Sequence, residues 1–429
     1  MLFKKLSRNN LAKTGVNYSI ASTLYSLSTM VVGFLNMRWI GPEHLGIWQS
    51  VAVVNAYIPF MQLGIQSGLN IELPKLLGAN RMSEAKEMVR TTLSFAFILS
   101  TLFTIISIVC VAILFFKGVD DKVIWGAIAI AIIAICQCFH LHYIATYRSA
   151  KAFDKLTRIF YIRCVVTVAL IPLMYYYGYY GLIVYNIISE VLMVSLLWYF
   201  APYKHETPKF SSSVFTPLLK KGVILSVVRF LTSTIESMPR LILLKFGTVV
   251  SVGLFSPALT IGTFMNMIPN QLSQFLHPQF GYKYGQSGHA RDMWPYFKKI
   301  TFYAPLILLP IALMGWICIP YIIEWVFPKY VESIGAIRIM LLGFMFSTSY
   351  LSRGFLFTIK AHKEIILLQL IDILLFGGIP VLLITIFPGH LLVMTATGIS
   401  VAYFFSYNVN ILLIRRTIFM EKYNIAANE

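Results

Sequence analysis

Apolar stretches of about 20 residues recur along the whole chain and are separated by short polar or charged connections. A helix needs roughly that length to cross the hydrocarbon core of a bilayer. The pattern therefore predicts an all-α polytopic membrane protein with about twelve transmembrane helices. The predicted spans cover residues 14–37, 46–70, 92–116, 123–147, 158–177, 181–201, 222–244, 251–276, 300–323, 333–357, 365–387 and 391–413.

Composition agrees with this pattern. The chain is 58% hydrophobic and only 12% charged, and its mean hydropathy is +0.75. An ordinary soluble domain has a charged fraction of about 25%. The connections between spans are short, so we expect no soluble domain on either side of the membrane.

Basic residues lie mainly on alternate connections. Lys and Arg outnumber Asp and Glu by 35 to 17, which gives a net charge of +18. Lys4 and Lys5 precede the first span, and Lys75 and Arg81 lie on the next connection of the same side. The positive-inside rule then predicts an even number of spans with both termini in the cytoplasm. We attribute the net charge to this topology and to contact with membrane lipid headgroups, and expect no nucleic acid partner.

The longest polar connection lies at the middle of the chain. It predicts an N-terminal six-helix lobe at residues 1–201, a cytoplasmic linker at 202–221 and a C-terminal six-helix lobe at 222–429. Short matches at nearly constant spacing support two parallel repeats with a substrate path between them. The matched pairs are Gly46 with Gly253, Pro74 with Pro278, and Gly126 with Gly335.

One face of the seventh span carries three charges, Arg229, Glu236 and Arg240. A charge near the bilayer centre costs roughly 2.5–3.5 kcal/mol, so this face should line a hydrated or protein-enclosed interior. We predict that Arg229 and Arg240 bind a charged substrate and that Glu236 is an ion-coupling candidate. Two alternatives stay open: a structural ion pair between Arg229 and Glu236, and an Arg240 side chain that extends toward the outer interface.

Amide side chains mark the second and eighth spans. If the path lies between the halves, these amides should line it, although hydrogen bonds between helices, each contributing about 0.6 kcal/mol, explain them equally well. The candidate residues are Asn55, Gln62 and Gln66 in the second span and Asn266, Asn270 and Gln274 in the eighth.

Two further carboxylates, Glu190 and Asp372, lie within predicted spans and could carry H⁺ or ligate Na⁺. The alternative is an ion pair with Arg163 or Arg338, and we expect Arg163 to extend from its span toward the inner interface. No metal site or cofactor is expected. His140 and His142 point about 200° apart on a helix, so packing is the better interpretation of both.

Several segments resemble the Wzx-type polysaccharide flippases. They are Arg38 to Trp48, Leu63 to Asn70 with Lys75 to Gly78, Ile235 to Phe255, and Phe327 to Tyr330. These flippases form the polysaccharide-transporter branch of the MOP superfamily, which includes MurJ and the MATE exporters. The sequence departs from the family pattern where Pro239 separates Glu236 from Arg240 and where Pro328 replaces a usual glycine.

The resemblance implies a V-shaped transporter, not an enzyme, in the bacterial cytoplasmic (inner) membrane. Such a protein flips an undecaprenyl-pyrophosphate-linked oligosaccharide by alternating access, for O-antigen, capsule or a similar surface polysaccharide. The polymerase and chain-length regulator of the same pathway are candidate partners. Two alternatives remain: a multidrug or other exporter of the superfamily, and a membrane polysaccharide polymerase, for which no outer loop is long enough.

Overall fold

The computed structural model describes residues 8–203, 206–287, 289–347 and 349–420, and every regular element in these ranges is a helix. The predicted all-α fold is confirmed. The chain divides into two compact units. Unit 1 comprises residues 1–40 and 51–230, and unit 2 comprises residues 41–50 and 231–429.

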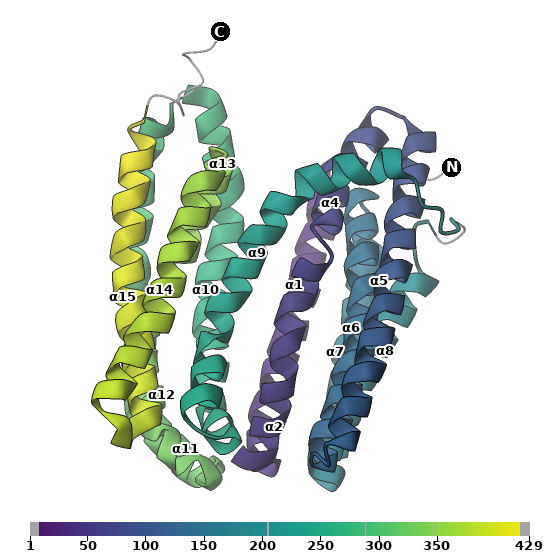
Figure 1. The fold of residues 1–429 in the computed structure, drawn as a ribbon. Helices are drawn as coiled ribbons and strands as arrows, with labels where there is room; N and C mark the ends of the chain where they lie inside the picture. Colours follow the sequence, from purple (N-terminus) through teal and green to yellow (C-terminus); the bar gives the residue numbers. More distant parts are fainter. Residues whose placement is uncertain (1–7, 204–205, 288, 348, 421–429) are drawn as a thin grey trace. The chain divides into compact units, whose positions relative to one another are not determined.

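Unit 1 is a bundle whose long helices run side by side (Figure 1). Its elements are α1 (Arg8–Trp39), the 3₁₀ helix η1 (Val53–Tyr57), α3 (Ile58–Met61), α4 (Ile65–Gly78), α5 (Met82–Phe116), α6 (Asp121–Ser149), α7 (Phe153–Ala169), α8 (Ile171–Tyr199) and the first part of α9 (Ser212–Phe246).

Unit 2 is also a bundle of helices. Its elements are most of α2 (Pro42–Ala52), the remainder of α9, α10 (Val249–Ser287), η2 (Ala290–Met293), α11 (Trp294–Val326), η3 (Pro328–Ser333), α12 (Ile334–Phe344), α13 (Ser349–Thr358), α14 (His362–Ile386), η4 (Pro388–His390) and α15 (Leu391–Ile418).

The boundary between the units lies inside a helix. α9 passes from unit 1 to unit 2 between Phe230 and Leu231, and it begins at Ser212, within the predicted linker 202–221. The lobes at 1–201 and 222–429 stay a prediction from the sequence.

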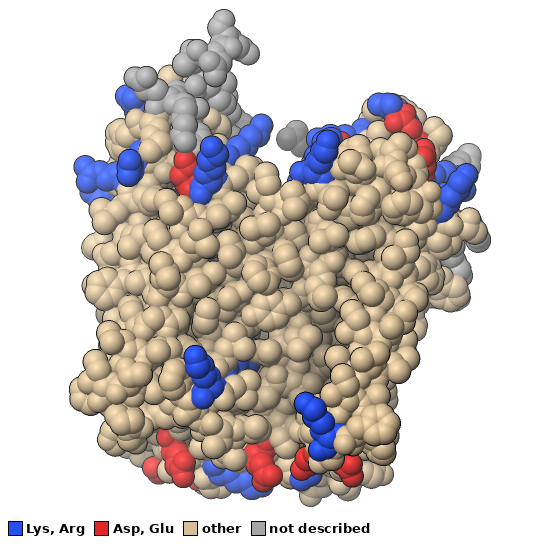
Figure 2. Space-filling model, viewed as in Figure 1, with Lys and Arg blue, Asp and Glu red and all other residues tan. Residues whose placement is uncertain are grey.

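Eight helices in the described ranges are long and apolar enough to cross a membrane. On the face shown in Figure 2, charged side chains gather at the two ends of each unit, with a broad, mainly uncharged band between them. The chain is a multi-pass membrane protein. The four remaining predicted spans, 46–70, 158–177, 222–244 and 333–357, are not among the eight, so the full count of twelve stays a prediction.

The prediction of one continuous helix over 46–70 is wrong. The segment forms α2, η1, α3 and α4, and it is broken where Leu63 and Gly64 adopt φ values of 53° and 75°. A residue with positive φ cannot continue a right-handed helix. Similarly, the span predicted at 333–357 is divided between α12 and α13.

Both units use the same packing order. In unit 1, α6 packs against α5 and α8, and α8 packs against α7. In unit 2, α12 packs against α11 and α15, and α15 packs against α14. These helices occupy corresponding places in the two halves of the sequence, as the predicted internal repeat leads one to expect.

Two glycines of the repeat meet within unit 2. A Cβ atom on Gly253 would lie 1.7 Å from the carbonyl oxygen of Pro42, and one on Gly46 would lie 2.0 Å from that of Val249. The contacts are reciprocal, because each glycine faces the residue four positions before the other. Only glycine permits backbones to approach this closely.

The start of α9 follows a segment held against α5. The Glu206 carboxylate pairs with Lys86 Nζ (3.1 Å) and Arg90 Nε (2.5 Å), and the Lys209 N–H donates to the Arg90 carbonyl (3.4 Å). Burial acts to raise the pKa of Glu206, but the hydrogen bonds from Lys86 and Arg90 outweigh it and lower that pKa. These bonds fix the position at which the helix that carries Arg229 begins.

The α2–α10 crossing gives a direct test of packing. Gly253→Ala should lower the free energy of unfolding by about 1–3 kcal/mol, because the new methyl group meets backbone that cannot move aside cheaply. Thermal unfolding of the purified protein in detergent measures this. Gly378→Ala is the matched control, since a Cβ there meets nothing within 4 Å. Equal unfolding temperatures for the two variants would contradict the crossing.

Candidate functional site

Each unit contains a polar cavity. The cavity of unit 1 has a volume of about 270 Å³ and is formed by α3, α4, α6, α7, α9 and the break between α3 and α4. Its polar lining residues are Gln62, Gln66, Ser67, Asn70, His140, Arg148, Ser226 and Arg229. This is a concave site with a few convergent polar groups, as ligand sites usually are.

The broken helix shapes this cavity. A Cβ on Gly64 would lie 2.1 Å from the Gly222 carbonyl oxygen, and one on Gly68 would lie 2.6 Å from that of Leu218. α4 and α9 are thus in backbone contact, and the Ser226 hydroxyl donates to the Phe60 carbonyl (3.3 Å). The close approach brings the amides of α4 next to the charged face of α9.

Positive charge dominates the cavity of unit 1. Arg148 and Arg229 both line it, and their charges act on each other. None of the side chains that line this cavity in the described part of the chain is a carboxylate. Two like charges at a partly enclosed site repel, so an anion between them would be stabilised strongly.

The two glutamines of this cavity retain unused acceptors. Gln62 and Gln66 are only 2% and 7% exposed, and the Oε1 atom of each has no hydrogen-bond partner. The Nε2 group of Gln62 donates to the Gln137 carbonyl (3.3 Å), which fixes its orientation. A buried acceptor without a partner costs about 1–3 kcal/mol.

A buried ion pair lies beside this cavity. Arg163 Nη2 lies 2.9 Å from Glu190 Oε1, and Glu190 Oε2 lies 3.4 Å from His140 Nδ1. Arg163 also lies over the Tyr25 ring, 4.5 Å from its centroid. The expectation that Arg163 extends toward the interface is wrong, because its side chain is buried and is attracted inward by Glu190. The structure therefore contains the ion pair, and the coupling role of Glu190 stays a prediction.

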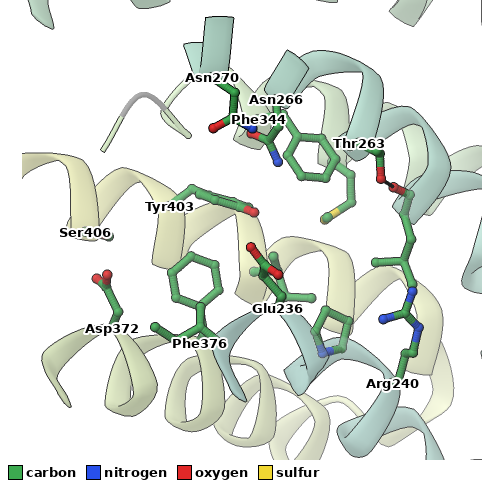
Figure 3. A pocket seen from close by; sticks show the side chains of 16 residues that line it. Glu236, Arg240, Thr263, Asn266, Asn270, Phe344, Asp372, Phe376, Tyr403 and Ser406 are labelled. Atoms are coloured by element: carbon green, nitrogen blue, oxygen red, sulfur yellow. Dashed lines mark hydrogen bonds between the residues drawn. The ribbon is translucent and has the colours of Figure 1, made fainter. Parts of the chain in front are cut away.

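The cavity of unit 2 has a volume of about 290 Å³. Figure 3 shows Asp372 and Ser406 at one end, Glu236 and Tyr403 near the middle and Arg240 at the other end. The remaining polar lining residues are Thr263, Asn266 and Asn270, and Phe344 and Phe376 supply aromatic faces. This cavity differs from that of unit 1 because it contains two carboxylates and one arginine.

Contacts within unit 2 hold these side chains in place. Arg240 Nε donates to Gln49 Oε1 (3.1 Å), and the charges of Arg240 and Glu236 interact across one helical turn. Asp372 is only 2% exposed, and Gln369, on the same helix, donates to the Thr232 hydroxyl of α9 (2.5 Å). Of the two alternatives for Arg240, the cavity position is therefore the one observed.

The predicted site residues fall into three groups. Arg229, Gln62 and Gln66 line the cavity of unit 1, while Arg240, Glu236, Asn266, Asn270 and Asp372 line that of unit 2. Asn55 lies in η1 with a buried Oδ1 atom and lines neither cavity. Gln274 lies on α10, but its side chain is outside the described residues.

Sequence reasoning missed Arg148 and His140 as lining residues. The predicted span ended at residue 147, which assigned Arg148 to a connection, whereas α6 continues to Ser149. His140, Ile144 and Arg148 follow one another at four-residue spacing and therefore share a helix face. This four-residue spacing was the signal in the sequence that could have identified His140 and Arg148 as lining residues.

Comparison with known proteins identifies the family. A family model described as "Polysaccharide biosynthesis protein" matches residues 37–334, more than half of the chain. The chain belongs to this family. No curated protein matches the chain significantly.

Solved structures of MATE transporters share the fold of this family member. An inward-facing multidrug resistance MATE transporter of the MOP superfamily has a TM-score of 0.78 at 16% identity, over 94% of this chain and 98% of that one. An outward-facing one has a TM-score of 0.71 at 16% identity, over 98% of both chains. A MATE in complex with MaD3S has a TM-score of 0.68 at 15% identity, over 95% of both chains.

These matches confirm the predicted resemblance to the polysaccharide flippases and the MOP superfamily. The protein is a multi-pass membrane protein of a polysaccharide biosynthesis family, and its fold is that of the MATE transporters.

Proposed function

We propose that this transporter flips undecaprenyl-pyrophosphate-linked oligosaccharide repeat units across the bacterial cytoplasmic membrane by alternating access, for surface polysaccharide synthesis. One observation carries the proposal. The cavity of unit 1 is lined by Arg148 and Arg229, and none of the described residues that line it is a carboxylate.

The chemistry of the substrate fits this cavity. A pyrophosphate diester has two permanent negative charges, and guanidinium groups bind such oxygens with paired, charge-assisted hydrogen bonds. Because Arg stays protonated inside a protein, two arginines near one another are stable only when an anion or solvent compensates them. The hydroxyl and amide side chains of Ser67 and Asn70, which also line the cavity, would form hydrogen bonds with sugar hydroxyls.

The charge of this cavity disfavours the main alternative. A cationic drug would be repelled by Arg148 and Arg229, so export of such drugs does not suit unit 1. A membrane polymerase is disfavoured on other grounds, since the family and fold are those of transporters.

The cavity of unit 2 supports ion coupling. Glu236 and Asp372 place two carboxylates in a membrane-embedded cavity, with oxygen donors from Tyr403, Ser406 and the amides of α10 nearby. Intramembrane carboxylates are typical of H⁺ and Na⁺ pathways. We propose that one of these ions binds here and that its gradient drives the conformational cycle.

The proposed function also implies an orientation in the membrane and a set of partners. We propose that both termini are cytoplasmic and that lipid headgroups contact the basic connections. The polymerase and chain-length regulator of the same pathway would receive the flipped unit.

Replacing the arginines tests the proposed substrate. Arg229→Ala and Arg148→Ala should each abolish display of surface polysaccharide, and Arg229→Lys should reduce it less. Each lost charged hydrogen bond costs about 1.5–3 kcal/mol, or roughly tenfold or more in affinity. Complementation of a deletion strain, with protein level measured in membranes, gives the readout.

Arg338→Ala is the control for that experiment. Arg338 Nε donates to the Trp316 carbonyl (3.0 Å), and Arg338 lines neither cavity. Normal display by Arg229→Ala at a normal protein level would remove Arg229 from substrate binding.

The coupling carboxylates are tested separately. Asp372→Asn and Glu236→Gln should stop the stimulation of lipid-linked oligosaccharide flipping by a H⁺ or Na⁺ gradient in proteoliposomes, because a neutral amide cannot exchange the ion. Substrate binding at the cavity of unit 1 should be retained. Full gradient stimulation in both variants would exclude these carboxylates from coupling.

A further inference from the structure

We infer that His140 is a proton-linked ligand of the anion bound in unit 1, so that binding of the pyrophosphate draws a proton onto its imidazole. The inference rests on the proposed function, because it concerns the same cavity. It adds a third positive charge, present only when the anion is bound, to the fixed charges of Arg148 and Arg229.

The geometry of the ring supports this assignment. His140 lines the cavity from α6, and its Nδ1 atom lies 3.4 Å from Glu190 Oε2. Glu190 is also held by Arg163, which keeps it in the carboxylate form, an acceptor only. Nδ1 must therefore donate its proton to Glu190, which leaves Nε2 as the nitrogen whose protonation can change.

The protonation state of Nε2 decides whether the ring repels or binds an anion. A neutral ring presents a lone pair, which repels phosphate oxygens, whereas a protonated ring presents an N–H donor with positive charge. Anion binding and protonation of His140 thus favour each other, and thermodynamic linkage makes the coupling equal in both directions.

Charged and titratable groups surround His140 on several helices. On its own helix, α6, these groups are Arg148 and Cys136, and Arg229 faces the cavity from α9. Glu190 and Tyr185 on α8, Arg163 on α7 and Tyr25 on α1 form the buried network behind the ring. α3 and α4 contribute only uncharged side chains to the lining.

A bound dianion would offset the charges of the two cavity arginines and would attract positive charge to the His140 ring.

His142, two residues further along α6, shows the contrast. It is buried, its Nδ1 atom lies 3.2 Å from the Thr92 hydroxyl, and it does not line the cavity. Because successive helix positions differ by about 100°, the two histidines face different surroundings. Only His140 is placed to respond to a ligand.

Calorimetry on the full-length protein in lipid nanodiscs tests the inference. The probe is a short-chain isoprenyl-pyrophosphoryl-N-acetylglucosamine, a diester whose two charges do not titrate near neutral pH. Measuring the binding heat in buffers of different ionisation enthalpy gives the number of protons taken up. We expect proton uptake on binding at neutral pH, and affinity that weakens roughly tenfold from about pH 6 to about pH 8.

Substitution of His140 tests whether its imidazole is the group that takes up the proton. His140→Gln, with His140→Asn as a second variant, should bind the probe without proton uptake and with affinity independent of pH. His390→Gln is the control, because His390 is exposed in η4 of unit 2, and it should behave as the wild type does.

The outcomes separate the two claims. Wild-type binding without proton uptake, or unchanged uptake in His140→Gln and His140→Asn, would overturn the role of His140 and leave the proposed anion site intact. Failure of the wild type to bind, or unchanged affinity in Arg229→Gln, would overturn the proposed function and with it this inference.

Discussion

A charged side chain inside a membrane must be paired or must face a polar cavity, and this constraint organises both units. Arg163 and Glu190 satisfy it by pairing within unit 1. Arg229 satisfies it at the wall of one cavity, which Arg148 also lines from the exposed end of α6, and Glu236, Arg240 and Asp372 satisfy it at the wall of the other. The cost of burying a charge thus makes the positions of these residues informative about function.

The two units share a packing order but differ in the charge of their cavities. Repetition accounts for the similar helix contacts and for the reciprocal approach of Gly46 and Gly253. It does not require the cavities to hold the same ligand. A cationic cavity suits the pyrophosphate of a lipid-linked glycan, and a cavity with two carboxylates suits a coupling ion, so the proposed division of roles follows from side-chain charge alone.

Hydropathy and motif resemblance were sufficient to predict the all-α membrane fold, the internal repeat and the family. The amides Gln62, Gln66, Asn266 and Asn270 stand out in the sequence because they are polar residues at helical spacing on an apolar background. The structure places them in the walls of two separate cavities, one in each unit, and their place on a path between the halves stays a prediction. Two features depend on long-range contacts: the first was missed, and the second was left open as an alternative. The break at Leu63 and Gly64 reflects the approach of Gly222 from a distant helix, and the Arg163–Glu190 pair joins α7 to α8. The lining role of Arg148 was hidden because the predicted span ended at residue 147, two residues before α6 ends at Ser149.

The central claim is that Arg148 and Arg229 hold the pyrophosphate in unit 1. An electron cryo-microscopy structure of the protein with a pyrophosphate-linked saccharide bound tests it most directly. The account predicts phosphate density within hydrogen-bonding distance of both guanidinium groups. Phosphate density in the cavity of unit 2, or an Arg229 side chain directed into lipid with no anion beside it, would contradict it.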